Sequence, residues 1–350
     1  MRIGLYGMPT AGKSYILDKI DFIKVVAGSK MLHKICPNFE SGNEEVKNRA
    51  RRKLAEQLIS TETFIMDGHY SFGDEISFTE SDGRLYDVFL YLYISPEVLR
   101  KRMETSERNR RYLSFDLEAW QKSEIEGLRI YCHQNNKDFY VLDNPTENQF
   151  EDVTIVIDFI RAVVNGYSCV SLADKCVKDI LLKSKSDVVT LMDGDKTITV
   201  EDSSNKVFGY ITHLYDGNFY TGYQSWKQSK EFEQYCFDDL TQMPVSLNKK
   251  VCKEIDGDTY ILTSGHERIW DYISKRLGVP YYFGAEMSAE TKLYVTKKLQ
   301  KTGKRVIAYG DSMNDYYMIK QADEGFLVTK KDSSISRSLK GKDMEGLKLV

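Results

Sequence analysis

The sequence has little proline, few cysteines, no large excess of either charge and no long apolar run. Six prolines, with 41% hydrophobic and 12% aromatic residues, exclude a disordered or low-complexity chain. The 49 basic and 52 acidic residues leave a net charge of -3, which disfavours a protein that coats nucleic acid but leaves room for a local basic groove. Without a run of about 18 apolar residues, we expect no membrane partner.

The cysteines show neither a C-x-x-C pair nor a spacing typical of zinc sites. They are Cys36, Cys132, Cys169, Cys176, Cys236 and Cys252. The first seven residues are typical of a strand that enters a glycine loop rather than of a signal peptide. We therefore expect reduced thiols and a cytoplasmic location.

Strand and helix signals alternate in both halves of the chain, as in parallel sheets covered by helices. Short apolar runs in the first half predict strands at 2–6, 22–27, 63–66, 88–94 and 139–142. Those in the second half predict strands at 188–192, 260–263 and 306–309. The predicted fold class is α/β, with two doubly wound parallel-sheet domains.

The predicted boundary between these domains lies near residue 165. A helical pattern at 147–164 ends at Asn165-Gly166, which is a typical end of a helix. At ~150 residues per domain, the length allows two domains. We therefore expect a first domain at residues 1–165 and a second at 166–350, with further helices at 43–60, 269–277 and 291–302.

The segment Gly7-Met8-Pro9-Thr10-Ala11-Gly12-Lys13-Ser14 matches the phosphate-loop pattern G-x-x-x-x-G-K-[ST] between a predicted strand and a predicted helix. Gly7 and Gly12 let backbone N–H groups turn toward a phosphate. In this pattern Lys13 contacts the β- and γ-phosphates of ATP, and Ser14 binds Mg²⁺. The first domain is therefore predicted to bind ATP and Mg²⁺, with Lys13 in a catalytic role.

Charged residues follow two later strands of the first domain. Asp67 ends the apolar run 64–66, at a position where a carboxylate can hold the metal's water shell; an ordinary strand-end aspartate is the alternative. Five arginines follow the strand at 88–94. They either clamp phosphoryl oxygens as a lid closes or form a solvated helix face: Arg100, Arg102, Arg108, Arg110 and Arg111.

Residues 1–145 resemble the nucleoside and nucleotide kinase branch of the P-loop proteins. The stretches Asp67-Gly68-His69 and Glu107-Arg108-Asn109-Arg110 are similar to those of archaeal-type adenylate kinases. The resemblance implies a kinase, but it does not identify the acceptor, which is a hydroxyl or a phosphate. It also implies that ATP and its phosphates contact Gly7, Gly12, Lys13, Ser14, Arg108 and Arg110.

An apolar run at 188–192 leads into Asp193-Gly194-Asp195-Lys196-Thr197, a D-x-D-x-T pattern. Two carboxylates at i and i+2 point the same way from a strand end, which suits one Mg²⁺ and one nucleophile. Three further pieces follow in order. They are Ser264 after a strand, Lys292 at the start of a helix, and Asp311 to Asp315 after a strand.

In this order, the four motifs resemble the haloacid dehalogenase superfamily, most closely its phosphoserine phosphatase-like branch, over residues 187–330. The resemblance implies that Asp193 attacks phosphorus and forms an aspartyl-phosphate. It implies that Asp195 protonates the leaving oxygen and later activates water. Ser264 and Lys292 would hold the phosphoryl group.

The same resemblance implies a Mg²⁺ site made by Asp193, Asp311 and Asp315 together with Asp195, whose backbone carbonyl would be the ligand. Lys196 departs from the pattern, because many relatives have a glycine at that position. The change alters the charge of the loop but leaves the nucleophile in place.

The residues between Asp195 and Thr263 are too many for a loop and predict a small inserted cap at roughly 200–258. Such a cap favours small or terminal phosphomonoesters. It is rich in aromatic residues, which we interpret as the core of the cap, with substrate stacking as the alternative. They are Phe208, Tyr210, Tyr215, Phe219, Tyr220, Tyr223, Trp226, Phe232 and Tyr235.

A kinase joined to a phosphatase is useful when the two reactions address different positions. The domain order is similar to that of phage-type polynucleotide kinase-phosphatases, which implies a nucleotide or a nucleic-acid end as the substrate. A metabolic fusion of two small-molecule enzymes, and an ATP sensor that gates the phosphatase, are the alternatives. Basic residues near the end of the chain form a solvated end or contact nucleic acid: Lys330, Lys331, Arg337, Lys340 and Lys342.

Overall fold

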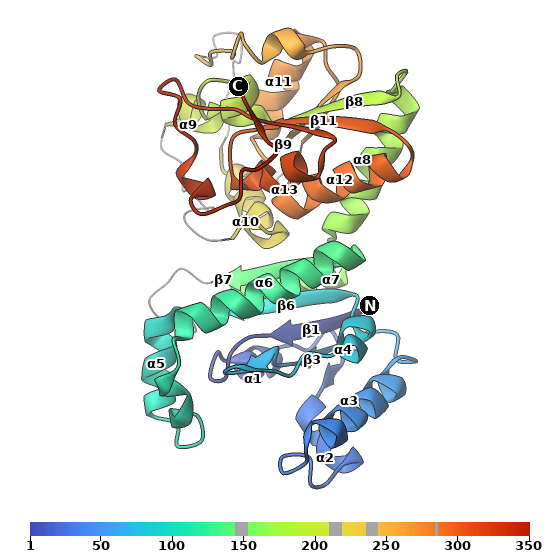
Figure 1. Cartoon of the computed structure of the whole chain (residues 1–350), viewed down its shortest axis with the longest axis vertical. Coiled ribbons are helices and arrows are strands. Elements are labelled where there is room, and N and C mark those ends of the chain that lie inside the picture. Colours follow the sequence, from blue (N-terminus) through green and yellow to red (C-terminus); the bar gives the residue numbers. More distant parts are fainter. Residues whose placement is uncertain (144–152, 210–218, 236–243, 284–285) are drawn as a thin grey trace. The chain divides into compact units, whose positions relative to one another are not determined.

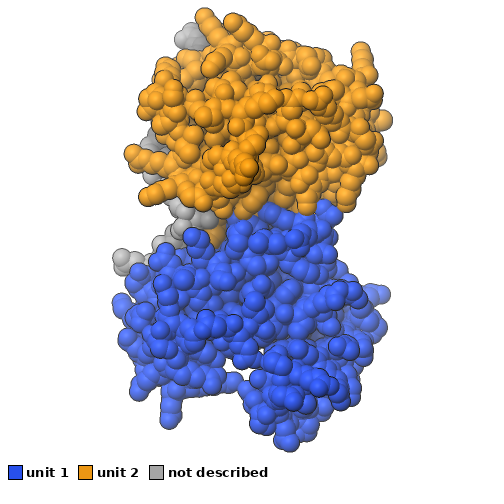
Figure 2. Space-filling view, viewed as in Figure 1, with its two compact units in different colours: residues 1–167 blue, residues 168–350 orange. Residues whose placement is uncertain are grey.

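Two parallel sheets, one in each half of the chain, contain most of the apolar runs of the sequence (Figure 1). The structure, a computed structural model, describes residues 1–143, 153–209, 219–235, 244–283 and 286–350. The chain divides into two compact units, Met1–Tyr167 and Ser168–Val350 (Figure 2). This division falls two residues beyond Asn165, the residue at which the first domain was expected to end.

The first unit is built on a five-stranded parallel sheet with the order β2-β3-β1-β6-β7. Consecutive residues of β6 and β7 are buried, which shows that both faces of the sheet are covered. The strands are β1 (Arg2–Tyr6), β2 (Val25–Val26), β3 (Phe64–Asp67), β6 (Val88–Tyr93) and β7 (Asp138–Asp143).

Helices connect these strands, and their boundaries follow local capping. Asn43 accepts a hydrogen bond from the Val46 N–H at 3.0 Å and caps α3 (Glu44–Leu58). Pro96 begins α5 (Pro96–Glu104) after a Ser95 cap. A short hairpin, β4 (Ser71–Phe72) and β5 (Glu75–Ile76), follows β3. The other helices are α1 (Lys13–Leu17), α2 (Gly28–Ile35), α4 (Glu80–Leu85), η1 (Arg110–Ser114), α6 (Leu117–Asn135) and α7 (Thr154–Val164).

The second unit is built on a six-stranded parallel sheet with the order β10-β9-β8-β11-β12-β13. Because β8 lies between β9 and β11, the segments that follow these three strands meet at one edge of the sheet. The strands are β8 (Val188–Met192), β9 (Thr259–Thr263), β10 (Tyr281–Phe283), β11 (Arg305–Gly310), β12 (Glu324–Leu327) and β13 (Lys348–Leu349).

Long helices and short turns surround this second sheet. Trp270, which is fully buried, anchors a core formed with residues such as Met192 and Ile261. The helices are α8 (Cys169–Lys183), α9 (Ser203–Phe208), α10 (Gly222–Phe232), α11 (Glu267–Leu277), α12 (Ala289–Lys301) and α13 (Met313–Gln321). The short turns are η2 (Gly194–Ile198), η3 (Cys252–Glu254) and η4 (Arg337–Leu339).

The expected α/β class is confirmed in both units. Within the described part of the predicted cap, Tyr223 is fully buried and the Phe208 and Tyr235 rings lie 4.9 Å apart. Tyr210, Tyr215 and Cys236 lie outside the described residues, as does the start of the helix expected at 147–164. Among the described helices, none alone has the length and hydropathy needed to cross a membrane, although α7 and α8 pass that test when taken together.

Candidate active sites

The glycine-rich loop of the first unit adopts backbone conformations that its glycines permit. Gly7 and Gly12 have φ values of 147° and 98°, and Thr10 adopts the left-handed region with φ 64°. A Cβ atom at Gly7 would lie 2.9 Å from the Leu92 carbonyl oxygen, so a side chain there would clash with β6. The loop is thus positioned by close contact of its backbone with the neighbouring strand.

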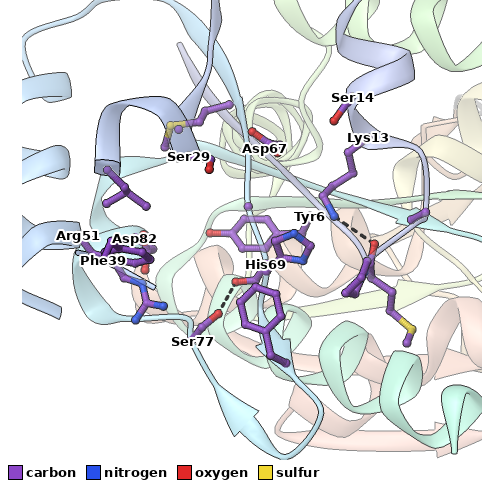
Figure 3. A pocket seen from close by; sticks show the side chains of 18 of the residues that line it. Tyr6, Lys13, Ser14, Ser29, Phe39, Arg51, Asp67, His69, Ser77 and Asp82 are labelled. Atoms are coloured by element: carbon purple, nitrogen blue, oxygen red, sulfur yellow. Dashed lines mark hydrogen bonds between the residues drawn. The ribbon is translucent and has the colours of Figure 1, made fainter. Parts of the chain in front are cut away.

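Lys13 lies folded into this loop with 6% of its surface exposed. Its Nζ donates to the carbonyl oxygens of Gly7 and of Met8, the latter at 3.2 Å (Figure 3). Burial lowers the pKa of Lys13 to about 8, although the Asp67 carboxylate acts in the opposite direction. The ammonium is therefore held by neutral carbonyl groups, which an anion can displace.

A cavity of about 860 Å³ opens beside the loop. Among the residues predicted from the sequence, Gly12, Lys13, Ser14, Asp67 and Arg108 line it. Other lining residues come from helices, the β4–β5 hairpin and loops. They include Ser29 of α2, Arg51 of α3 and Phe72 of β4, with Asp82 of α4 and the loop residues Phe39 and His69, and none of them was predicted as a ligand contact.

Two of the residues that the kinase resemblance assigns to the ATP phosphates do not line this cavity. Gly7 serves the backbone turn, and Arg110 donates to the Glu104 carbonyl oxygen at 2.8 Å. Arg111 lines the cavity, with its guanidinium carbon 4.8 Å from the centre of the Tyr112 ring. Arg102 donates to the Thr10 and Ala11 carbonyl oxygens, each at 3.3 Å, and so supports the loop.

A buried carboxylate, Glu124 of α6, fixes the hairpin that carries part of the cavity wall. It accepts hydrogen bonds from the Ser71 N–H at 3.0 Å, the Ser71 hydroxyl at 2.7 Å and the Tyr91 hydroxyl at 2.7 Å. The Trp120 indole N–H adds a fourth at 3.1 Å. Four donors satisfy a carboxylate that is otherwise costly to bury, and the position of Phe72 in the cavity follows from them.

In the second unit, three carboxylates converge at the end of the sheet. Asp193 follows β8, Asp311 follows β11, and Asp315 lies in the first turn of α13. One oxygen from each lies within 4.8 Å of the others. The Asp193 N–H donates to the Tyr309 carbonyl oxygen at 2.9 Å, so pairing between neighbouring strands sets this approach.

Lys292 of α12 lies among these carboxylates and is fully buried. Its Nζ is 2.6 Å from Asp193 Oδ1 and 2.7 Å from Asp315 Oδ1. Burial acts against its charge, but Asp193 and Asp315 outweigh that effect and raise the pKa of Lys292. The other oxygen of Asp315 accepts from the Ser312 hydroxyl at 3.0 Å and from the Ser312 N–H at 3.2 Å.

The cluster carries more acidic groups than its single ammonium can neutralise. Burial, and then the neighbouring Asp315, raise the pKa of Asp193 well above its usual range and that of Asp311 to about 7. A small cation with oxygen ligands would remove this repulsion. The chemistry of Asp193, Asp311 and Asp315 therefore fits Mg²⁺.

Asp195 lies outside this trio of carboxylate oxygens, in the turn η2. Its Oδ1 accepts from the Ser203 N–H at 2.8 Å. Burial, and then Asp202, raise the pKa of Asp195 to about 6. Lys196 beside it has φ 63°, a conformation that favours glycine, and its Nζ lies 3.0 Å from Asp202 Oδ2. This left-handed backbone explains why the resembled pattern has a glycine at this position.

Ser264 follows β9 and is linked to both the cap and the acidic loop. Its hydroxyl accepts from Asn314 Nδ2 at 3.3 Å, and its carbonyl oxygen accepts from Gln228 Nε2 at 3.2 Å. Asn314 also donates to the Met287 carbonyl oxygen at 3.2 Å. Neither Gln228 nor Asn314 was predicted as a site residue, since a single amide carries no recognisable spacing.

A model of the haloacid dehalogenase-like hydrolase family matches residues 228–323. The matched segment contains Ser264, Lys292, Asp311 and Asp315, but not Asp193 or Asp195. The resemblance to the haloacid dehalogenase superfamily is confirmed for this segment, and the phosphoserine phosphatase-like branch stays a prediction. The search of curated proteins finds no match to the chain.

Solved structures similar to this chain include kinases and a hydrolase. Shikimate kinase from Acinetobacter baumannii in complex with shikimate is 15% identical, over 46% of this chain and 93% of its own, with a TM-score of 0.34. A sugar kinase from Janibacter sp. HTCC2649 is 16% identical, over 48% and 96%, with a TM-score of 0.33. A haloacid dehalogenase family hydrolase from Salmonella enterica subsp. enterica serovar Typhi is 15% identical, over 42% and 64%, with a TM-score of 0.29.

Proposed function

We propose that the chain is a bifunctional kinase-phosphatase that acts on nucleotides or polynucleotide ends. The first unit would transfer a phosphoryl group from ATP, and the second would hydrolyse a phosphomonoester. The observation that carries the phosphatase half is the contact of one buried ammonium, Lys292, with two of three clustered carboxylates. A cluster with surplus acidic groups around one cation is suited to a metal and a phosphate together.

In the phosphatase reaction, an oxygen of Asp193 would attack phosphorus while the bond to the leaving oxygen breaks. Asp195 would give its proton to that oxygen, and its raised pKa of about 6 allows it to carry a proton near neutral pH. Water then attacks the aspartyl-phosphate, Asp195 takes a proton from it, and inorganic phosphate leaves. Ser264 and Lys292 would hold the phosphoryl oxygens through both steps.

Mg²⁺ in this site would be held by Asp193, Asp311, Asp315 and the Asp195 backbone carbonyl. It would neutralise charge on the phosphoryl oxygens. Lys292 would exchange part of its contact with Asp193 for a phosphoryl oxygen. The same ammonium would thus neutralise the carboxylate in the empty site and the phosphoryl group in the occupied one.

In the kinase reaction, ATP phosphates would occupy the loop from Gly7 to Ser14. Lys13 would leave the Gly7 and Met8 carbonyl oxygens for the β- and γ-phosphates, and Arg108 at the cavity wall would contact the transferring group. Ser14 and Asp67, which line the same cavity, would hold Mg²⁺ and its water shell. The acceptor would enter beside α2, α3 and the β4–β5 hairpin.

The test uses an oligonucleotide with a 5′-hydroxyl and a 3′-phosphate, incubated with ATP labelled at the γ-phosphate and Mg²⁺. We expect label at the 5′ end and release of inorganic phosphate from the 3′ end. A panel of mononucleotides, sugars and phosphorylated small metabolites is assayed in parallel. If transfer and hydrolysis occur only with the sugars and small metabolites, the chain is instead a metabolic fusion of two small-molecule enzymes. If it binds ATP without transferring phosphate to any acceptor, the first unit is an ATP sensor.

A further inference from the structure

A positively charged segment lies beside the acidic loop of the second unit. Residues 328–342, here called the basic strap, follow β12 and include the turn η4. The Val328 N–H donates to the Gly310 carbonyl oxygen at 2.8 Å, and the Met313 N–H donates to the Ser338 hydroxyl at 3.1 Å. Gly310 and Met313 flank Asp311 in the sequence, so the strap is held on both sides of this carboxylate.

The strap has a fixed backbone. Leu339 is 1% exposed and anchors it to the unit, and the Thr329 N–H donates to the Val350 carbonyl oxygen at 3.0 Å. A turn closes through the Lys330 N–H, which donates to the Ser334 carbonyl oxygen at 2.9 Å. Any charge on the strap is therefore presented from a defined position beside the site.

Five basic residues and one acidic residue occupy the strap of a chain whose net charge is -3. The acidic residue, Asp332, accepts two hydrogen bonds from Ser334, at 3.0 Å from its N–H and at 2.6 Å from its hydroxyl. Four of the cations are exposed and have no carboxylate within 4.0 Å among the residues that the structure describes. They are Lys330, Lys331, Arg337 and Lys340.

Three basic residues close by in the same unit contact carboxylates. Lys320 lies 2.8 Å from Asp343, and Arg305 and Lys348 both pair with Glu324. Four of the five strap cations, by contrast, have no carboxylate partner among the described residues. Unpaired cations at a fixed position attract an anion that carries several charges, because each contact displaces condensed counterions.

We propose that the basic strap binds the backbone phosphates of a single-stranded polynucleotide whose terminal phosphate enters the Asp193 site. This proposal rests on the proposed phosphatase function of that site. One phosphomonoester brings only its own charge, which Lys292 and a metal ion would balance inside the site. The strap lies beside it, where the next phosphates of a bound strand would be placed, and a small metabolite has no charge to place there.

The experiment compares two substrates and two variants of the full chain. The substrates are a ten-nucleotide DNA with a 3′-phosphate and p-nitrophenyl phosphate, each assayed over a range of salt concentrations. The strap variant is K330Q/K331Q/R337Q/K340Q. The matched control, K175Q/K178Q/K183Q/K185Q, removes four exposed lysines from α8 and from the residues just before β8.

We expect the strap variant to lose about tenfold in kcat/KM for the DNA at low salt, with a salt slope that falls by about 0.7 for each contact removed. Activity on p-nitrophenyl phosphate should stay at the wild-type value, which also shows that the variant folds. The control should match the wild type on both substrates. An unchanged rate on DNA, or an equal loss on both substrates, would overturn the proposal.

Binding separates the strap from the chemistry. Fluorescence anisotropy of the labelled DNA with wild type and strap variant requires no turnover. If the wild type hydrolyses neither substrate, the phosphatase proposal fails, and the strap is then judged by binding alone. Weaker binding by the strap variant supports the inference, and equal binding refutes it.

Discussion

The two candidate sites hold their lysines in different surroundings. Lys13 contacts the neutral carbonyl oxygens of Gly7 and Met8 beside an open cavity, and burial lowers its pKa to about 8. Lys292 is enclosed between Asp193 and Asp315, which raise its pKa. A lysine held by carbonyl groups is available to an incoming anion, whereas one held by carboxylates also stabilises the fold around it.

The largest effect that distinguishes the two sites is expected from Asp193→Asn. An amide cannot act as the nucleophile, so phosphatase activity should fall by at least ~10³-fold. Transfer from ATP should remain at the wild-type rate, because Lys13 and its loop belong to the other unit. Steady-state phosphate release and label transfer, measured on the same preparation, check both statements. Loss of transfer in this variant would mean that the sites are coupled.

Lys13→Ala is the counterpart in the first unit. Removing the ammonium that would contact the β- and γ-phosphates should lower the transfer rate by ~10²–10³-fold. Phosphatase activity should be unchanged. The control Lys19→Ala, which removes an exposed lysine just after α1, should affect neither reaction. A normal transfer rate without Lys13 would contradict its assignment to the ATP phosphates.

Lys292→Gln tests whether the second lysine has a role in stability as well. The substitution leaves Asp193 and Asp315 buried without their ammonium, and breaking such a pair costs about 3–5 kcal/mol of unfolding free energy. Urea unfolding in the presence of a chelator should show this loss, and Mg²⁺ should recover part of it. A variant as stable as the wild type under both conditions would indicate that the cluster is not charged as described.

The phosphatase should also depend on pH through Asp195. As a general acid this residue must be protonated, and its pKa is raised to about 6 by burial and Asp202. The protonated fraction falls as pH rises above that value, so the first step should slow by about tenfold per pH unit well above it. Rapid-mixing measurements of leaving-group release between pH 5 and 9 test this. With a very good leaving group, which needs no proton, the dependence should disappear.

The smallest expected effect is that of Lys196→Gly. Glycine relieves the left-handed backbone, which costs other residues about 1 kcal/mol, while the exposed pair with Asp202 is worth less than about 1 kcal/mol. Stability in thermal unfolding should therefore change little, and activity should persist. A large loss of activity would assign Lys196 a direct role in the site.

The two sites also differ in how well the sequence predicted them. The phosphate loop is one continuous segment, and its glycines and lysine are recognisable from spacing alone. The strands β8, β9 and β11 were predicted to within a residue at each end, because buried parallel strands are short apolar runs. Asp193, Ser264 and Asp311 were singled out as candidates because each follows such a strand, and Lys292 because it lies near the start of a predicted helix.

Other parts lacked a local signal. The long helix α6 was not predicted, since its buried face includes polar residues whose main partners are distant in sequence, such as Ile94 for Gln121 and Ser71 for Glu124. The strand expected at 22–27 is reduced to Val25–Val26, because only these two residues pair with β3. Arg110 and Arg111 are adjacent arginines, and only the backbone of η1 decides which of them lines the cavity.

Under the proposed function, one chain has two independent sites, one that transfers phosphate and one that removes it. An equimolar mixture of the Lys13→Ala and Asp193→Asn proteins tests this on the oligonucleotide with a 5′-hydroxyl and a 3′-phosphate. We expect Lys13→Ala to remove only the 3′-phosphate and Asp193→Asn to phosphorylate only the 5′ end. The mixture should modify both ends, each reaction at the rate of the variant that retains that activity. A mixture that leaves either end unmodified would contradict the proposed function.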